Sequence, residues 1–117
     1  MGLDSDRFVL APGIGLLEEL NIPYSVSINS AHRTPKRMVQ FAEASASKGI
    51  KVIIAAAGGA AHLPGMIVAN TWLPVIGISI KGSSLDGMDS LLSIFQMPVC
   101  DTGISSRNRV TPVSVLS

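Results

Sequence analysis

The feature that most limits the fold is an uncharged stretch from Val52 to Ile80, in which there is no Asp, Glu, Lys or Arg. A stretch of this length could span a bilayer as one helix. Residues that break helices recur within it, namely Gly58, Gly59, Pro64, Gly65, Pro74 and Gly77. We therefore interpret it as a buried strand, a glycine turn, a short helix and a second buried strand, and we expect no membrane partner.

Composition narrows the class of protein. With 117 residues the chain is the size of one domain. Nine Lys and Arg against eight Asp and Glu leave a net charge of +1, and aromatic residues make up 4%. Neither an attractive field nor a stacking platform for nucleic acid is present, so we expect no nucleic-acid partner. Charged residues are only 15%, which favours burial on both faces of a sheet or against sister subunits.

Cysteine and histidine usage bears on compartment and metals. Cys100 is the single cysteine, so no internal disulfide can form, as suits a reducing compartment. No secretory signal is visible, because Asp4, Asp6 and Arg7 interrupt the N-terminus. Two histidines and one cysteine, without a His-x-x-x-His pattern, predict no metal site. We expect a cytoplasmic protein, or a plastid one if the source is a plant.

Alternating strands and helices are predicted along most of the chain. The patterns predict strands at 24–28, 52–56 and 75–80, and helices that begin at Thr34-Pro35, near 61 and near 85. Residues 14–20 also look helical, although Pro12, Gly13 and Gly15 weaken that start. The segment 99–117 has no clear period and is interpreted as an irregular tail. This βαβ order predicts an α/β fold with a parallel sheet and helices on both faces.

Ligands of open parallel sheets bind at the carboxyl ends of the strands. Four segments are expected there, at 2–6, 30–35, 57–65 and 81–84, and both histidines lie in them. Each residue type there has two interpretations. His32 either acts on a ligand or braces its loop, and Arg33 either clamps an anion beside a helix N-terminus or is simply solvated. Gly58-Gly59 allows either close approach of a ligand or a tight turn.

Four motifs carry a family resemblance. They are SAHRTP at 30–35, GGAAHLPGM at 58–66, LPVIG at 73–77 and DSLLSIFQMP at 89–98. Together they resemble the purine-pathway family of N5-carboxyaminoimidazole ribonucleotide mutase, also called the catalytic subunit or domain of phosphoribosylaminoimidazole carboxylase. The match runs from about Gly2 to Pro98. The SAHRTP and AAHLPGM motifs resemble those of the mutase branch of the family. The resemblance implies a flavodoxin-like, three-layer α/β sandwich that forms a homo-oligomer, usually an octamer.

The resemblance also implies an activity and a site. The family moves a carboxylate from N5 to C4 of an aminoimidazole ribonucleotide without metal or organic cofactor. Its catalytic histidine falls on His32, which would shuttle a proton around a transient CO2. An imidazole suits this step because its unperturbed pKa lies near neutrality. The matching substrate-binding positions are Gly2 and Leu3 in the opening loop, Ser5 and Arg33 for phosphate, Asp6 for ribose, and Ser30, Ala31, Ala57, Gly58, Ala60, His62 and Leu63 for the base and CO2.

Several departures from the family pattern leave alternatives open. Leu3 replaces a serine that contacts phosphate, at a cost of about 1–3 kcal/mol if that partner is lost. The family has a strand before the opening loop, and after Pro98 it has another strand and a long helix. We therefore expect a catalytic domain at 1–98, an atypical tail at 99–117 and a truncation at both ends. Fusion to an ATP-dependent carboxylating partner, an inactive truncated homologue, and an unrelated nucleotide-binding module remain as alternatives.

Overall fold

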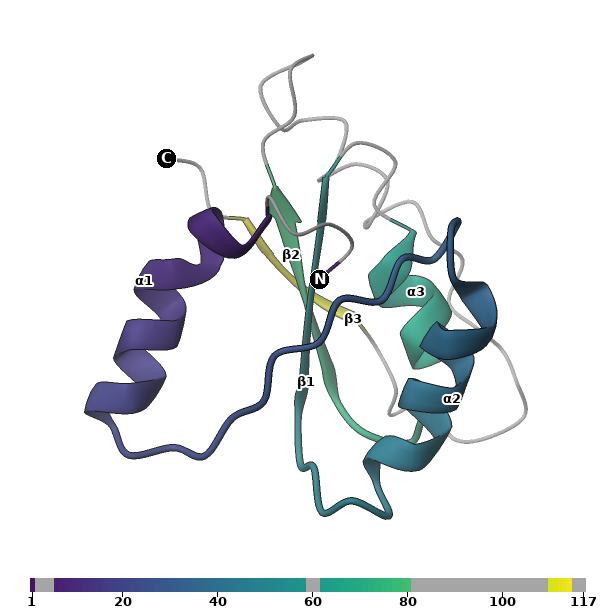
Figure 1. Ribbon diagram of the computed structural model, residues 1–117, viewed down its shortest axis with the longest axis horizontal. Helices are drawn as coiled ribbons and strands as arrows, with labels where there is room; N and C mark the ends of the chain where they lie inside the picture. The colour runs from purple at the N-terminus through teal and green to yellow at the C-terminus, as the bar shows by residue number, and fades with distance from the viewer. Residues whose placement is uncertain (2–5, 59–61, 81–109, 115–117) are drawn as a thin grey trace.

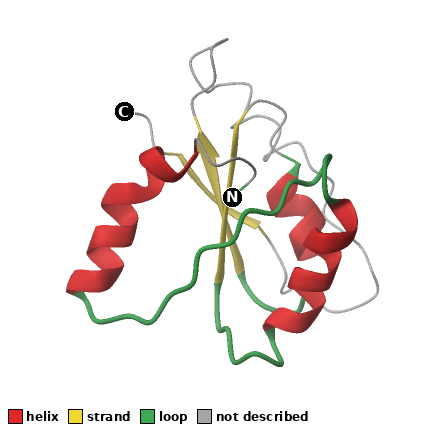
Figure 2. Ribbon diagram, viewed as in Figure 1, coloured by secondary structure: helices red, strands yellow, loops and turns green. Residues whose placement is uncertain are grey.

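The computed structural model describes residues 1, 6–58, 62–80 and 110–114. Within them, three strands form one sheet, with helix α1 on one side and helices α2 and α3 on the other (Figures 1 and 2). This is the three-layer α/β arrangement that was predicted. The elements are α1 (Asp6–Glu19), α2 (Pro35–Ser45), β1 (Ile53–Gly58), α3 (Leu63–Val68), β2 (Val75–Ile80) and β3 (Val110–Ser114).

The uncharged stretch forms β1, α3 and β2, as the sequence predicts. β1 and β2 pair in parallel, from Ile53 opposite Val75 to Gly58 opposite Ile80. The two strands therefore end at the same level, at Gly58 and Ile80. No helix within the described part of the chain is long and apolar enough to cross a membrane.

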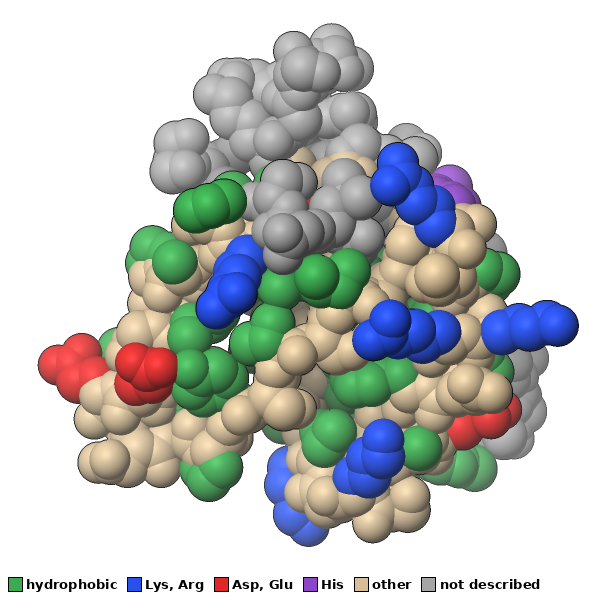
Figure 3. Space-filling model, viewed as in Figure 1, with side chains coloured by type: hydrophobic (Ala, Val, Ile, Leu, Met, Phe, Trp, Pro, Cys, Tyr) green, Lys and Arg blue, Asp and Glu red, His purple; other side chains and the backbone are tan. Residues whose placement is uncertain are grey.

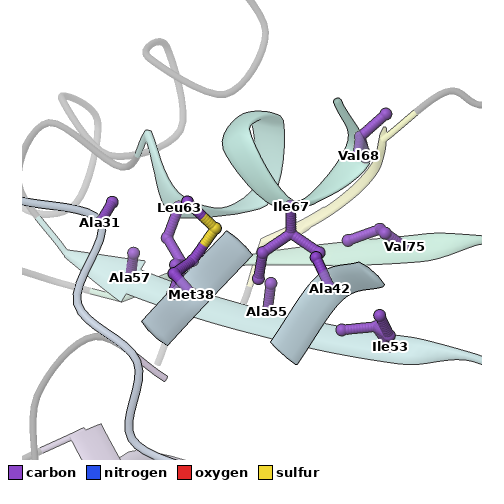
Figure 4. Packing of buried hydrophobic residues seen from close by; sticks show 10 residues of the cluster. All are labelled: Ala31, Met38, Ala42, Ile53, Ala55, Ala57, Leu63, Ile67, Val68 and Val75. Carbon is purple, nitrogen blue, oxygen red and sulfur yellow. The ribbon is translucent and has the colours of Figure 1, made fainter. Parts of the chain in front are cut away.

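The core lies between the sheet and the pair α2 and α3. Met38 and Ala42 of α2 are fully buried, and they meet Ile67 of α3 and Ala55 of β1 in one cluster (Figure 4). Residues 38 and 42 are about one helical turn apart, so they lie on the same face of α2. Ser45, one turn beyond Ala42, is also fully buried, and its hydroxyl donates to the carbonyl of Phe41. Burial of that hydroxyl is therefore compensated within the helix.

Helix α1 begins earlier than predicted and runs through Pro12 without interruption. The expectation that Pro12 and Gly13 would break it is therefore wrong. Pro12 lacks only the N–H that would donate to the carbonyl of Phe8, one turn earlier. Apart from Asp6, no residue of α1 is buried, so the helix contributes little to the core.

The strand predicted at 24–28 is absent, and residues 22–30 are extended without strand pairing. Alternating side chains make a strand only where a neighbouring backbone completes the ladder. Within the described part of the chain, Met1 provides the backbone partners for this segment. The Met1 amine donates to the carbonyl of Ser27 at 3.2 Å, and the Asn29 N–H donates to the carbonyl of Met1 at 2.9 Å. Val26 and Ile28 consequently remain 48% and 38% exposed.

The interpretation of 99–117 as an irregular tail is wrong for residues 110–114. They form β3, which pairs in parallel with β2 in the order β1-β2-β3. Local periodicity could not show this, because the pairing joins segments about thirty residues apart in sequence. Pro112 lies opposite Gly77, and proline is tolerated in an edge strand of this kind. The helix predicted at 85–97 lies outside the described residues, and the domain boundary at 98 remains a prediction.

Candidate functional site

The loop before α2 is a turn closed by its own polar groups. The carbonyl of Ser30 accepts the N–H of Thr34 at 3.1 Å and the Thr34 hydroxyl at 3.2 Å. The hydroxyl of Ser30 accepts the N–H of Arg33 at 3.2 Å. Thr34 occupies the N-cap position and Pro35 starts the helix, as predicted, but the Thr34 hydroxyl bonds within the loop and caps no helix amide. The turn fixes the backbone on both sides of His32.

The second loop connects the end of β1 to the start of α3. Gly58 ends β1, and a Cβ added there would lie 3.3 Å from the carbonyl oxygen of Ile80. A glycine therefore suits the close approach of the two strand ends. His62 stands at the N-cap position of α3, directly before Leu63, which is 2% exposed. The buried start of α3 holds the His62 backbone against the core.

These two loops bring the two histidines of the chain together. His62 Nδ1 lies 3.4 Å from His32 Nε2 across a separation of thirty residues. The ring planes meet at 85°, with centroids 5.6 Å apart. When both rings are neutral, a hydrogen bond at this contact requires one nitrogen to donate and the other to accept, so each imidazole influences the tautomer of the other.

Positive charge surrounds this contact. Arg33, Lys36 and Arg37 are exposed at and after the start of α2. Figure 3 shows Lys and Arg side chains gathered on the side of the molecule that α2 forms. A helix N-terminus adds a partial positive charge of its own. The arrangement favours a negatively charged group near His32.

The first turn of α1 reaches the same end of the sheet (Figure 1). Asp6 opens the helix and is 6% exposed. Burial lowers the pKa of the nearby Met1 amine, while the charge of Asp6 opposes that shift. A carboxylate is thus placed beside the strand ends, as the sequence predicts for Asp6.

The remaining predicted site residues are either buried beneath the two loops or outside the described part of the chain. Ala31, Ala57 and Leu63 belong to one buried cluster, so they support the two loops from beneath. Gly2, Leu3, Ser5 and Ala60 lie outside the described residues. Sequence reasoning missed Asn29, which is 3% exposed and whose Oδ1 has no hydrogen-bond partner among the described residues. Its only signal is an amide directly before the SAHRTP motif.

Comparison with known families decides the assignment. Residues 1–106 match the family described as AIR carboxylase. The chain belongs to the AIR carboxylase family. The match includes both histidine loops and the whole uncharged stretch, and it extends beyond Pro98, where the resemblance read from the motifs ended.

Named relatives come from fungi, bacteria and archaea. Phosphoribosylaminoimidazole carboxylase of Schizosaccharomyces pombe is 59% identical over 98 residues, which are 84% of this chain and 18% of that protein. N5-carboxyaminoimidazole ribonucleotide mutase of Pyrococcus horikoshii is 56% identical over 98 residues, or 55% of its length. The mutase of Bacillus subtilis is also 56% identical, over 60% of its length. This AIR carboxylase chain thus spans little more than half of the mutases that it matches.

Proposed function

We propose that this chain supplies the catalytic loops of a purine-biosynthesis enzyme that converts N5-carboxyaminoimidazole ribonucleotide to 4-carboxy-5-aminoimidazole ribonucleotide. The observation that carries the proposal is the placement of His32, in the SAHRTP turn, against His62 of the AAHLPGM loop, at 3.4 Å. Family membership and relatives named for this reaction support it. No organic cofactor is needed for the chemistry that we derive below.

The proton balance of the reaction explains why one imidazole can suffice. Cleavage of the N5–carboxylate bond releases CO2 and requires a proton on N5. Attack of C4 on that CO2 forms the new carbon–carbon bond and must release the C4 proton. The two transfers cancel, so His32 gives a proton in the first step and takes one back in the second. Its neighbour His62 is placed to hold the ring in the orientation that both transfers require.

The remaining groups would bind and orient the ribonucleotide. We assign phosphate binding to Arg33 and Ser5, because a guanidinium at a helix N-terminus favours a phosphate dianion. Asp6 would accept hydrogen bonds from the ribose hydroxyls. Leu3 offers no hydrogen bond to the phosphate. The proposed base and CO2 pocket is completed by Ser30, Ala31, Ala57, Gly58, Ala60 and Leu63.

Turnover of N5-carboxyaminoimidazole ribonucleotide, followed by ultraviolet absorbance, tests the proposal. We expect turnover by the parent chain and a loss of at least about a hundredfold in His32→Asn, because the proton shuttle is removed. Gln40→Ala, an exposed change on α2, is the matched control and should keep the parent rate. Equal turnover by His32→Asn would remove His32 from the mechanism. A folded parent without turnover would contradict the activity of this chain.

A second candidate function is a partner-dependent homologue without activity of its own. Large apolar side chains are exposed on α1 and directly after it, with Phe8 at 86%, Leu16 at 54% and Leu20, which follows the helix, at 58%. Such surface is typical of a chain that completes its packing against other subunits. Recovery of turnover only after mixing with a full-length relative would favour this candidate.

We also propose homo-oligomeric assembly, in a cytoplasmic setting or in a plastid if the source is a plant. The fungal relative is more than five times as long as the matched region, since that region is 18% of it. This supports the further proposal that the domain works beside, or fused to, an ATP-dependent enzyme that supplies the carboxylated substrate.

A further inference from the structure

We propose that His32 and His62 together form a two-nitrogen site for a divalent transition-metal ion such as Zn²⁺. Sequence patterns for metal sites look for ligands close together in the chain, and these two are thirty residues apart. Only the folding of two separate loops onto one sheet edge brings them into contact. Binding of the ion rests on this geometry alone and does not depend on the proposed function.

The spacing of the two nitrogens fits one ion. His62 Nδ1 and His32 Nε2 are 3.4 Å apart. With zinc–nitrogen bonds of about 2.0–2.1 Å, an ion that touches both makes an N–Zn–N angle of about 110°, the tetrahedral value. The nearly perpendicular rings, at 85°, are not stacked face to face. A modest rotation of each ring therefore directs both lone pairs at the ion in place of the hydrogen bond.

The exposure of the two histidines and the type of their ligand atoms determine which divalent ions are favoured. His32 is exposed and His62 is half-buried, so an ion can reach the pair from solvent. Among the described residues, no group of three or more His, Cys, Asp or Glu could hold a metal. Water would complete the coordination, and the exposed Arg33 and Lys36 oppose a cation here, so the site is open and exchanges its ion readily. Two imidazoles favour Zn²⁺, Cu²⁺ and Ni²⁺ over Mg²⁺ and Ca²⁺, which prefer oxygen ligands.

One consequence rests on the proposed function. The ion would take the one lone pair of the neutral His32 ring, so the ring could no longer be protonated to the imidazolium that gives its proton to N5. An occupied pair therefore cannot carry out the shuttle, and Zn²⁺ should inhibit turnover in competition with the substrate. The proposed site is inhibitory and differs in role from a resident cofactor.

Isothermal titration calorimetry tests the proposal by measuring zinc binding to the full chain in a buffer that does not coordinate zinc. We expect saturable binding of one ion per chain, and a Kd raised at least about tenfold in His32→Asn and in His62→Asn. Cys100→Ser is the control for the single thiol and should keep the parent Kd. Absence of binding, an unchanged Kd in either histidine variant, or loss of binding in Cys100→Ser would each overturn the proposal.

A second measurement needs no variant and no activity. The chain has two histidines, so its imidazole Hε1 protons give two NMR signals. Substoichiometric paramagnetic Ni²⁺ should broaden both signals together, whereas broadening of one or neither would contradict a shared site. Zinc binding without turnover would overturn the proposed function alone, and turnover without zinc binding would overturn this inference alone.

Discussion

At the residue scale, the fold depends on a few side chains that the packing encloses completely. Met38 has no exposed surface and lies where α2, α3 and β1 meet (Figure 4). Gln40, two residues further on, faces solvent. The helical period explains this difference, since positions 38 and 42 share a face that position 40 does not.

Met38→Ala should lower the free energy of unfolding by about 2–5 kcal/mol, because the buried side chain leaves a cavity. Gln40→Ala should change it by less than about 0.5 kcal/mol. Urea unfolding of both variants against the parent measures the difference. Equal stability of the two variants would show that α2 does not pack on the sheet through Met38.

The Met1 amine gives a pH dependence of stability. Burial lowers its pKa below the usual 8.0, and Asp6 opposes the shift only in part. Between the lowered pKa and 8.0, the unfolded chain binds more protons than the folded chain at this group. The free energy of unfolding should therefore rise with pH across this window and gain nothing further above it.

Urea unfolding over a pH series measures this contribution on protein that retains Met1. The Nα-acetylated chain is the control, because it lacks the titrating amine while its histidines titrate as in the parent. We expect the difference between the two profiles to change as the pH approaches 8.0 from below. Parallel profiles would mean that the amine is not buried against Ser27.

At the element scale, α1 and the segment 22–30 show how context overrides local preference. Pro12 stands inside α1, and Gly13 and Gly15 follow it, yet the helix is continuous. Conversely, residues 24–28 have the alternation of a strand but form none. Helical hydrogen bonds are made within the segment, so a poor sequence can still complete them, whereas a strand depends on a neighbour.

The helix should therefore become more stable when its breakers are removed. Pro12→Ala should raise the free energy of unfolding by up to about 3 kcal/mol, and Gly13→Ala by about 0.5–1 kcal/mol. A Cβ at Gly13 meets no atom within 4 Å, so no clash offsets the gain. Far-UV circular dichroism during urea unfolding measures both variants. A loss of stability in both would show that α1 is not helical through this region.

At the scale of the whole molecule, the sheet is better covered on one side than on the other. α2 and α3 enclose the core, while Ile54 on β1 remains 46% exposed and Phe8 on α1 remains 86% exposed. Figure 3 shows hydrophobic side chains at the surface between the α1 side and the centre of the molecule. Exposed apolar surface of this kind favours association.

We expect the chain to self-associate as its concentration rises. Phe8→Ser and Leu16→Ser should weaken this association, because each removes exposed apolar surface from α1. Ala11→Ser, on the same helix, is the matched control and should have little effect. Sedimentation velocity over a range of concentrations measures the association. A parent chain that stays monomeric throughout would contradict the expectation.

The sequence by itself determined the features that depend on neighbours along the chain. The apolar run at 52–56 predicted a buried strand, Pro35 predicted the start of a helix, and glycine and proline between 58 and 65 predicted a turn and short helix. The motifs at 30–35 and 58–66 identified the family and its candidate site. These signals are local, because backbone hydrogen bonds and side-chain periodicity act over a few residues.

Only the tertiary structure decided the features that join distant segments. Met1 pairs with Ser27 and Asn29, and residues 110–114 extend the sheet beside β2, although neither pairing has a local signal. The 3.4 Å contact between His32 and His62 likewise exists because the turn before α2 and the loop between β1 and α3 fold against each other. Such contacts depend on how whole elements pack, which no short stretch of sequence encodes.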